Sequence, residues 1–110
     1  MFVSMNRFKI RTGREADFEA AWRGRETFLD EVPGYLAFAV LRNETAADGV
    51  TEFISTATWQ SREDFEAWRN SDLFRRAHAQ GSLEGVLAGP PEVSLYEAVV
   101  SEERTRVEAP

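Results

Sequence analysis

The sequence predicts an α+β domain in which two helices cover one face of an antiparallel sheet. Two observations carry this prediction. Four segments have the composition and alternation of β-strands, and two segments have apolar residues at helical spacing. Their order along the chain is β-α-β-β-α-β, which is the order of a ferredoxin-like fold with both helices on the same side of the sheet.

The first strand is expected over residues 2–11. Strand alternation places Asn6 on the same face as Phe2, Phe8 and Ile10. A buried amide without a hydrogen-bond partner costs about 1–3 kcal/mol. The amide of Asn6 therefore needs a partner if this apolar face is buried.

A first helix is expected between Thr12 and the pair Pro33-Gly34. Thr12 and Glu15 have the spacing of a capping box, and apolar residues keep helical spacing as far as Leu29. Pro33-Gly34 is predicted to stop this helix.

A hairpin is expected in the middle of the chain. Residues 35–43 are apolar on both faces, which predicts a central strand. A polar loop ends at Asp48-Gly49, and residues 50–59 are predicted to pair with the strand before it.

The second helix is predicted to begin at a cap made by Ser61 and Asp64. A glycine-rich loop follows over residues 81–91 and is closed by Pro90-Pro91. The last strand is expected over residues 92–100.

The segment "EDFEAWRNSDLFRRAH" ends in the only histidine of the chain, His78. Asn70, Ser71 and Asp72 in its middle prefer helix caps to helix interiors. In one straight helix, the ten residues from Trp68 to His78 would separate these side chains by about 15 Å. A break at residues 70–72 is therefore predicted, and it would let both side chains border one cavity.

Composition limits the class of protein. The 110 residues fit one domain, expected over residues 1–100, with a charged and flexible tail over residues 101–110. The net charge of −6 argues against nucleic acid as a partner. The sequence holds no cysteine, no apolar run of about 20 residues and no signal-peptide pattern at its start. A cytoplasmic protein without a membrane role is expected, and the small core favours an oligomer.

Taken singly, the candidate residues have simpler explanations. A histidine at a helix end is often placed there because a cation suits the helix dipole. Trp68 is explained by the core alone, and Asn6 by a satisfied buried amide or a place near the sheet edge. Their combination is what suggests a function.

Three motifs together resemble a known family. They are "MNRF" with Asn6, "TATWQSREDFEAWRNSD" with Trp68, and "LFRRAH" with His78. The chain resembles the antibiotic-biosynthesis-monooxygenase (ABM) superfamily over about residues 1–100. Within it, the combination of these three residues resembles the IsdG-type haem-degrading monooxygenases.

The resemblance implies a homodimer in which two sheets form an α+β barrel, with one haem per subunit between helices and sheet. It implies that His78 is the proximal ligand of the haem iron, that Asn6 lies on the distal side, and that Trp68 distorts the macrocycle. It also implies that haem is both cofactor and substrate, opened with O₂ and electrons from an unidentified reductase. The usual roles of imidazole and amide side chains agree with these assignments.

Further residues are expected to bind the haem. Phe8, Trp22 and Phe65 are predicted to line the pocket, although each is equally explained as core. Arg25 lies where related enzymes carry a basic residue near the haem edge and is the first candidate for the propionates. Arg75 and Arg76 are weaker candidates, because a solvated helix face explains them as well.

Other functions stay open at this point. One is a cofactor-free monooxygenase of the same superfamily that acts on a quinol or polyketide-like substrate. In that case His78 is a surface residue, and Asn6 or Trp68 contacts the substrate. A second is a haem-binding dimer that buffers haem without turnover. A third is a dimer of this superfamily without pocket chemistry.

Overall fold

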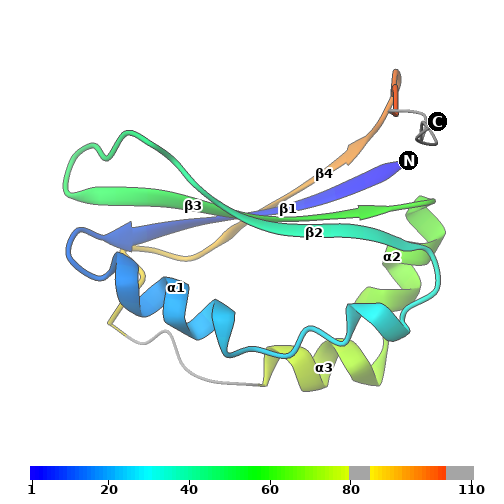
Figure 1. Ribbon diagram of the computed structural model, residues 1–110, viewed down its shortest axis with the longest axis horizontal. Helices are drawn as coiled ribbons and strands as arrows, with labels where there is room; N and C mark the ends of the chain where they lie inside the picture. Colours follow the sequence, from blue (N-terminus) through cyan, green and yellow to red (C-terminus); the bar gives the residue numbers. More distant parts are fainter. Residues whose placement is uncertain (80–84, 104–110) are drawn as a thin grey trace, which may run out of the picture.

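The computed structural model describes residues 1–79 and 85–103 (Figure 1). The strands and helices have the following bounds in chain order: β1 Phe2–Arg11, α1 Glu15–Arg23, the 3₁₀ turn η1 Leu29–Glu31, β2 Tyr35–Arg42, β3 Val50–Trp59, α2 Arg62–Arg69, α3 Asp72–His78 and β4 Glu92–Glu97. The predicted tail lies outside the described residues from position 104 onward.

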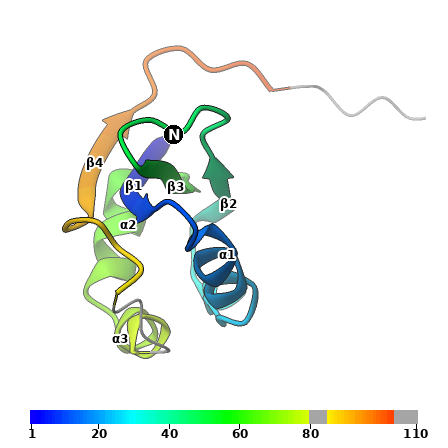
Figure 2. The same ribbon diagram turned by 90° about the vertical axis from the view of Figure 1, so that its left-hand side faces the viewer.

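The sheet has the strand order β2-β3-β1-β4, and every neighbouring pair is antiparallel. All helices lie on the same side of this sheet (Figures 1 and 2). Helix α1 lies toward the β2 edge, and α2, which contacts β1 and β3, lies toward the β4 edge. This arrangement confirms the ferredoxin-like α+β fold that the sequence predicts.

The alternation predicted for β1 is present. Phe2, Phe8 and Ile10 are buried on the face toward the helices, whereas Arg7 and Lys9 are exposed. Asn6 shares the buried face, and its strand partners are Ser55 of β3 and Val93 of β4. Asn6 therefore lies in the middle of the sheet, which excludes the edge position as its explanation.

The hairpin turn before β3 is confirmed. Asp48 and Gly49 both have positive φ angles, of 53° and 75°. Ala47 and Val50 exchange two backbone hydrogen bonds of 3.0 Å around them. Positive φ at both central residues is the geometry of a two-residue turn that matches the twist of the strands.

The first helix is shorter than predicted. Helix α1 begins at Glu15 and ends at Arg23, and Arg14 is its N-cap without a side-chain hydrogen bond. The predicted capping box at Thr12 is therefore wrong, because the Glu15 carboxylate accepts from the Gly13 N–H instead. The helix ends at Gly24, a residue type that disfavours helix interiors. The following segment up to η1 is irregular.

Two strand predictions also need correction. Strand β2 is an edge strand of the sheet and not a central one. The two βαβ-type crossovers of this topology place β1 and β3 in the centre, so an apolar pattern on both faces does not identify a central strand here. Leu36 and Leu41 of β2 are accordingly exposed. Strand β4 ends at Glu97, earlier than predicted.

The predicted break in the second helical region is confirmed. Helix α2 begins at Ser61, whose hydroxyl accepts from the Asp64 N–H at 3.1 Å. It ends at Asn70, and Ser71 caps α3 by accepting from the Phe74 N–H at 3.2 Å. In Figure 1 the two helices run in different directions.

The buried residues form two clusters. The first cluster lies toward α2 and α3 and contains Phe2, Leu29, Trp59, Phe65, Trp68 and Ala77. The second cluster lies toward α1 and contains Phe8, Ile10, Phe18, Phe53 and Val86. The separation of these clusters leaves room for a cavity between them.

Part of the glycine-rich loop extends the sheet. The Arg11 N–H donates to the Val86 carbonyl at 3.0 Å, and the Ala88 N–H donates to the Lys9 carbonyl at 2.7 Å. Residues 80–84 of this region lie outside the described residues. Within the described ranges, no helix is long and apolar enough to cross a membrane.

Gly34 offers a test of how β2 meets α2. Its φ of +83° is in the left-handed region, and a Cβ there would overlap the Asp64 side chain. Gly34→Ala should therefore lower the free energy of unfolding by about 1–3 kcal/mol, measured by urea denaturation. Gly89→Ala is the control, because nothing lies within 4 Å of its Cβ position. Equal stability of the two variants would contradict this account.

Candidate functional site

A cavity of about 460 Å³ lies between the sheet and the helices. Its walls come from all four strands, the three α-helices and the segment between α1 and β2. The structure places all seven candidate residues on this cavity: Asn6, Phe8, Trp22, Arg25, Phe65, Trp68 and His78. These residues come from four separate elements and the loop after α1, so the fold brings them together.

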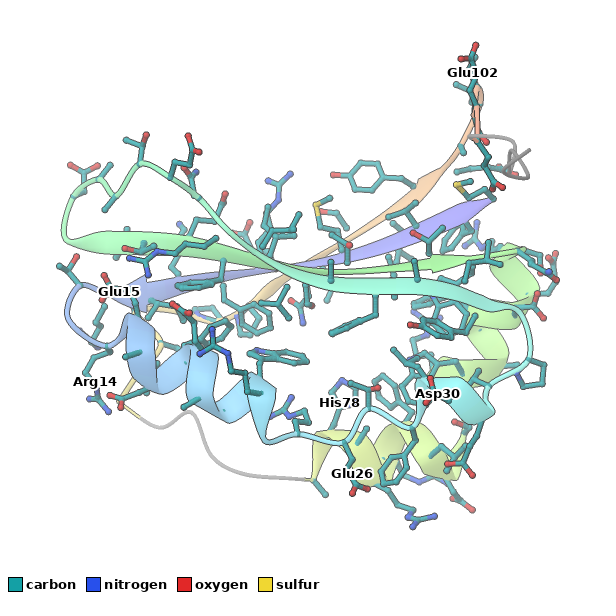
Figure 3. The ribbon with its side chains drawn as sticks, in the orientation of Figure 1. Arg14, Glu15, Glu26, Asp30, His78 and Glu102 are labelled. Carbon is teal, nitrogen blue, oxygen red and sulfur yellow. The ribbon has the colours of Figure 1, made fainter. Side chains whose placement is uncertain are left out.

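His78 is the last residue of α3, and its exposed side chain lies on the side of α3 that faces the sheet (Figure 3). Its Nδ1 atom is 2.8 Å from the Phe74 carbonyl oxygen. A carbonyl can only accept, so Nδ1 carries the hydrogen in the neutral ring. The Nε2 atom then has a free lone pair, which is what a metal ion requires.

Trp68 forms part of the floor of the cavity and is buried. Its ring packs on Trp59, with centroids 6.2 Å apart, and meets Phe74 edge-on at 5.4 Å. A side chain held between two aromatic rings has little freedom to rotate. Trp68 therefore presents a rigid surface to any ligand in the cavity.

Asn6 forms part of the opposite wall, on the sheet. Its carbonyl oxygen Oδ1 is covered and has no hydrogen-bond partner among the described residues. A buried amide oxygen without a partner is costly. This finding argues against the simple explanation of Asn6 as a satisfied buried amide. Buried polar atoms without a hydrogen-bond partner are often found at functional sites.

Trp22 and Arg25 form the end of the cavity beside α1. The guanidinium of Arg25 lies over the Trp22 ring at 4.6 Å from its centroid. Burial lowers the pKa of the Arg25 guanidinium below its ordinary value, but an arginine stays charged at neutral pH. The cavity therefore has one cationic end and a largely apolar interior.

The two weaker arginine candidates do not border the cavity. Arg75 pairs with Asp72 on the exposed side of α3, and the Arg76 guanidinium lies 4.9 Å from the Phe28 ring centroid. Arg69 lines the cavity instead. Its guanidinium is 5.3 Å from the Phe65 ring centroid and pairs with Glu66.

Sequence reasoning missed Arg69 together with Phe74, Ser55 and Thr27, which also line the cavity. Arg69 lies four residues after Phe65, so helical spacing was a usable signal. Ser55 is the strand partner of Asn6. That pairing depends on the register of β1 and β3, which the sequence pattern does not specify.

The comparison with protein families matches residues 1–80 to the antibiotic biosynthesis monooxygenase family. Curated relatives similar to this chain are named heme-degrading monooxygenase, from Bacillus thuringiensis (strain Al Hakam) and Bacillus cereus (strain AH187). Each is 36% identical over 56 residues, which cover 50% of this chain and 51% of the relative. The chain thus spans about half the length of the curated relatives it matches.

Solved structures with the same fold have lower sequence identity. A heme degrader of Mycobacterium tuberculosis, MhuD, described with two hemes in its active site, has a TM-score of 0.71 and 24% identity over 94% of this chain and all of its own. SnoaB from Streptomyces nogalater, a cofactor-independent oxygenase, has a TM-score of 0.66 and 21% identity over 91% and 94%. At such identities the likeness shows the fold alone.

The unpartnered oxygen of Asn6 has a measurable consequence in the ligand-free protein. Asn6→Leu should raise the free energy of unfolding by about 1 kcal/mol, because it removes a buried acceptor that has no partner. Urea denaturation without added ligand measures this change.

Asn70→Leu is the matched control, because the Asn70 side chain donates to the Glu66 carbonyl at 3.0 Å. This variant should lose about 0.5–1 kcal/mol. A loss of stability in Asn6→Leu as large as in the control would show that the Asn6 amide is satisfied.

Proposed function

The chain belongs to the antibiotic biosynthesis monooxygenase family, and from this premise we propose that it is a haem-degrading monooxygenase. It binds haem as substrate and cofactor, opens the porphyrin ring with O₂ and an external electron donor, and releases the iron. The observation that carries this proposal is that one cavity is bordered by His78, Trp68 and Asn6. Relatives named heme-degrading monooxygenase support it from sequence.

The residues of the cavity fit haem. His78 offers a lone pair at Nε2, because its Nδ1 faces the Phe74 carbonyl. The cavity volume of about 460 Å³ is within the roughly 300–1,000 Å³ of small-molecule and cofactor sites. Aromatic and aliphatic side chains make up most of its lining, which suits an apolar disc.

Each of the three residues has a separate task in this proposal. His78 holds the iron from the α3 side. Asn6 faces the same space from β1 and offers an amide N–H, a donor that does not compete as an acid. Trp68 is held by Trp59 and Phe74, and it sets the shape of the ligand that the floor of the cavity accepts. Haem supplies the redox chemistry with O₂.

Charged groups at the cavity walls would bind the propionates. Arg25 is the first candidate, because it lies at the cationic end beside Trp22. Arg69 is a second candidate that the structure adds, and Arg75 and Arg76 lie away from the lining. Bidentate contact with a carboxylate is the interaction that a guanidinium makes best.

We also propose that the protein is a homodimer. The face of the sheet opposite the helices carries Val3 and Met5 of β1, Ile54 of β3, Leu41 of β2 and Tyr96 of β4, as the strand registers show. Leu41 and Tyr96 are exposed in the single chain. The same face also carries Arg7, Lys9 and Glu52, and its exposed apolar side chains are expected to pack against another sheet. A cytoplasmic location and an unidentified reductase remain part of the proposal.

Haem binding is the first test. Hemin added to the purified protein should give a shifted, saturable Soret band at one haem per chain. His78→Ala should weaken haem binding by more than about 100-fold. Removing a residue that merely orients a metal ligand already lowers metal affinity about 10–100-fold, and removing the ligand itself should cost more. Added imidazole should restore part of the band in this variant.

Arg75→Ala is the matched control, because Arg75 lies on the same helix but not on the cavity. Absence of a saturable band in the wild-type protein would contradict haem binding. It would then favour a cofactor-free monooxygenase acting on a quinol or polyketide-like substrate.

Turnover is the second test. With an electron donor and O₂, and with catalase present to remove free peroxide, the Soret band should bleach and iron should be released. Asn6→Ala should bind haem but degrade it about 100-fold more slowly, as expected for loss of a preorganised donor. A band that persists in the wild-type protein would instead indicate a haem-binding dimer without turnover.

The dimer has its own test. Sedimentation should give twice the chain mass of 12.5 kDa. Val3→Glu should give the monomer mass, because its strand partners Thr58 and Tyr96 carry no charge and a buried charge without a partner is costly. Thr45→Glu in the exposed loop before β3 is the control. A wild-type monomer would contradict this proposal.

A further inference from the structure

Phe74 connects two residues of the candidate site. Its ring meets Trp68 edge-on, with centroids 5.4 Å apart. It also packs against the imidazole of His78, with centroids 3.9 Å apart and an interplanar angle of 30°. Phe74 also lines the cavity. Trp68 and His78 are therefore linked through ring contacts with Phe74.

The same residue contacts His78 a second time through its backbone. The Phe74 carbonyl oxygen is 2.8 Å from Nδ1 of His78. This oxygen cannot donate, so the contact is a hydrogen bond only when Nδ1 carries the hydrogen. Phe74 therefore acts on the imidazole through both its side chain and its carbonyl group.

These two contacts matter because His78 is exposed at the end of a short helix. An exposed imidazole on a fraying helix end would change rotamer and exchange between its two neutral tautomers. Residues four apart in a helix lie on the same face, so Phe74 is well placed to prevent this. The Phe74 N–H is itself held by the Ser71 hydroxyl at 3.2 Å.

We propose that Phe74 is a positioning residue: it holds His78 in the Nδ1–H tautomer, with Nε2 free toward the cavity, before any ligand binds. The bond to the carbonyl group selects the tautomer, and the stacked ring holds the imidazole in the plane and position in which this bond can form. The consequence for iron binding rests on the proposed function, whereas the tautomer itself does not. A histidine that is already oriented binds a metal more tightly, because less freedom is lost on binding.

The protein allows a direct test without haem. His78 is the only histidine of the chain, so a long-range ¹H–¹⁵N correlation spectrum of the ligand-free protein shows its ring nitrogens alone. At a pH where the imidazole is neutral, the spectrum should report a protonated Nδ1 and an unprotonated Nε2. A dominant Nε2–H tautomer in the wild-type protein would overturn the proposal.

Variants separate the ring from the rest of the helix. Phe74→Leu keeps the carbonyl group but removes the aromatic ring, and it should give a mixture of tautomers. Phe74→Tyr keeps a ring and should retain the Nδ1–H tautomer. Leu73→Ala is the control, because Leu73 also packs against the first core cluster. An unchanged spectrum in Phe74→Leu, a Tyr variant that behaves like the Leu variant, or an equal change in Leu73→Ala would each overturn the role of the ring.

Haem provides a second readout. Phe74→Leu should weaken hemin binding about tenfold, within the range for residues that orient a metal ligand. It should also alter the axial-ligand signature in the electron paramagnetic resonance spectrum of the ferric complex. If hemin binds through His78 while both properties are unchanged, the proposal fails and the proposed function stands. If the Nδ1–H tautomer is observed but hemin does not bind, the proposed function fails and the positioning stands.

Discussion

The turn at Ser71 is the local constraint on which the candidate site depends. Its hydroxyl donates to the Trp68 carbonyl at 2.7 Å and accepts from the Phe74 N–H at 3.2 Å. One side chain thus bonds the last turn of α2 and the first turn of α3. The Trp68 carbonyl also accepts from the Ser71 N–H at 3.0 Å, whereas the Phe74 N–H is one of the donors that the start of a helix leaves without an intrahelical partner. Because α3 then starts in a new direction, His78 borders the cavity that Trp68 also borders. A continuous helix would have placed them about 15 Å apart along its axis.

Much of the fold follows from local chemistry that the sequence displays. The caps at Ser61 and Ser71 and the turn at Asp48-Gly49 were all predictable, because each requires particular residue types over three or four positions. The end of α1 was not predictable in this way. The apolar residues after Gly24 keep helical spacing, although the backbone leaves the helix at Gly24. The apolar pattern of β2 also did not show that this strand lies at the edge of the sheet. The order of strands in the sheet is set by the topology of the whole chain.

The same division applies to the candidate site. The structure brings Asn6, Trp68 and His78 to one cavity, but the sequence suggested this only through a family resemblance and a predicted helix break. The contribution of Arg69 and the contacts of Phe74 with its two neighbouring rings depend on three-dimensional packing. The four-residue spacings of Phe65 with Arg69 and of Phe74 with His78 place each pair on one helix face. Which face borders the cavity does not follow from that spacing, because several rotamers and helix directions are compatible with it.

The position of the cavity between two separate core clusters links binding to stability. A chain of 110 residues has little apolar surface to bury, yet this one divides its core and leaves about 460 Å³ between the parts. Phe65 and Trp68 border the cavity from the first cluster and Phe8 borders it from the second. An apolar ligand that fills this space would join the two clusters into one continuous core. At 100 times its dissociation constant, such a ligand adds about 2.7 kcal/mol to the stability of the folded state. The ligand would thus act as an added part of the core and raise the stability of a domain whose own interior is incomplete.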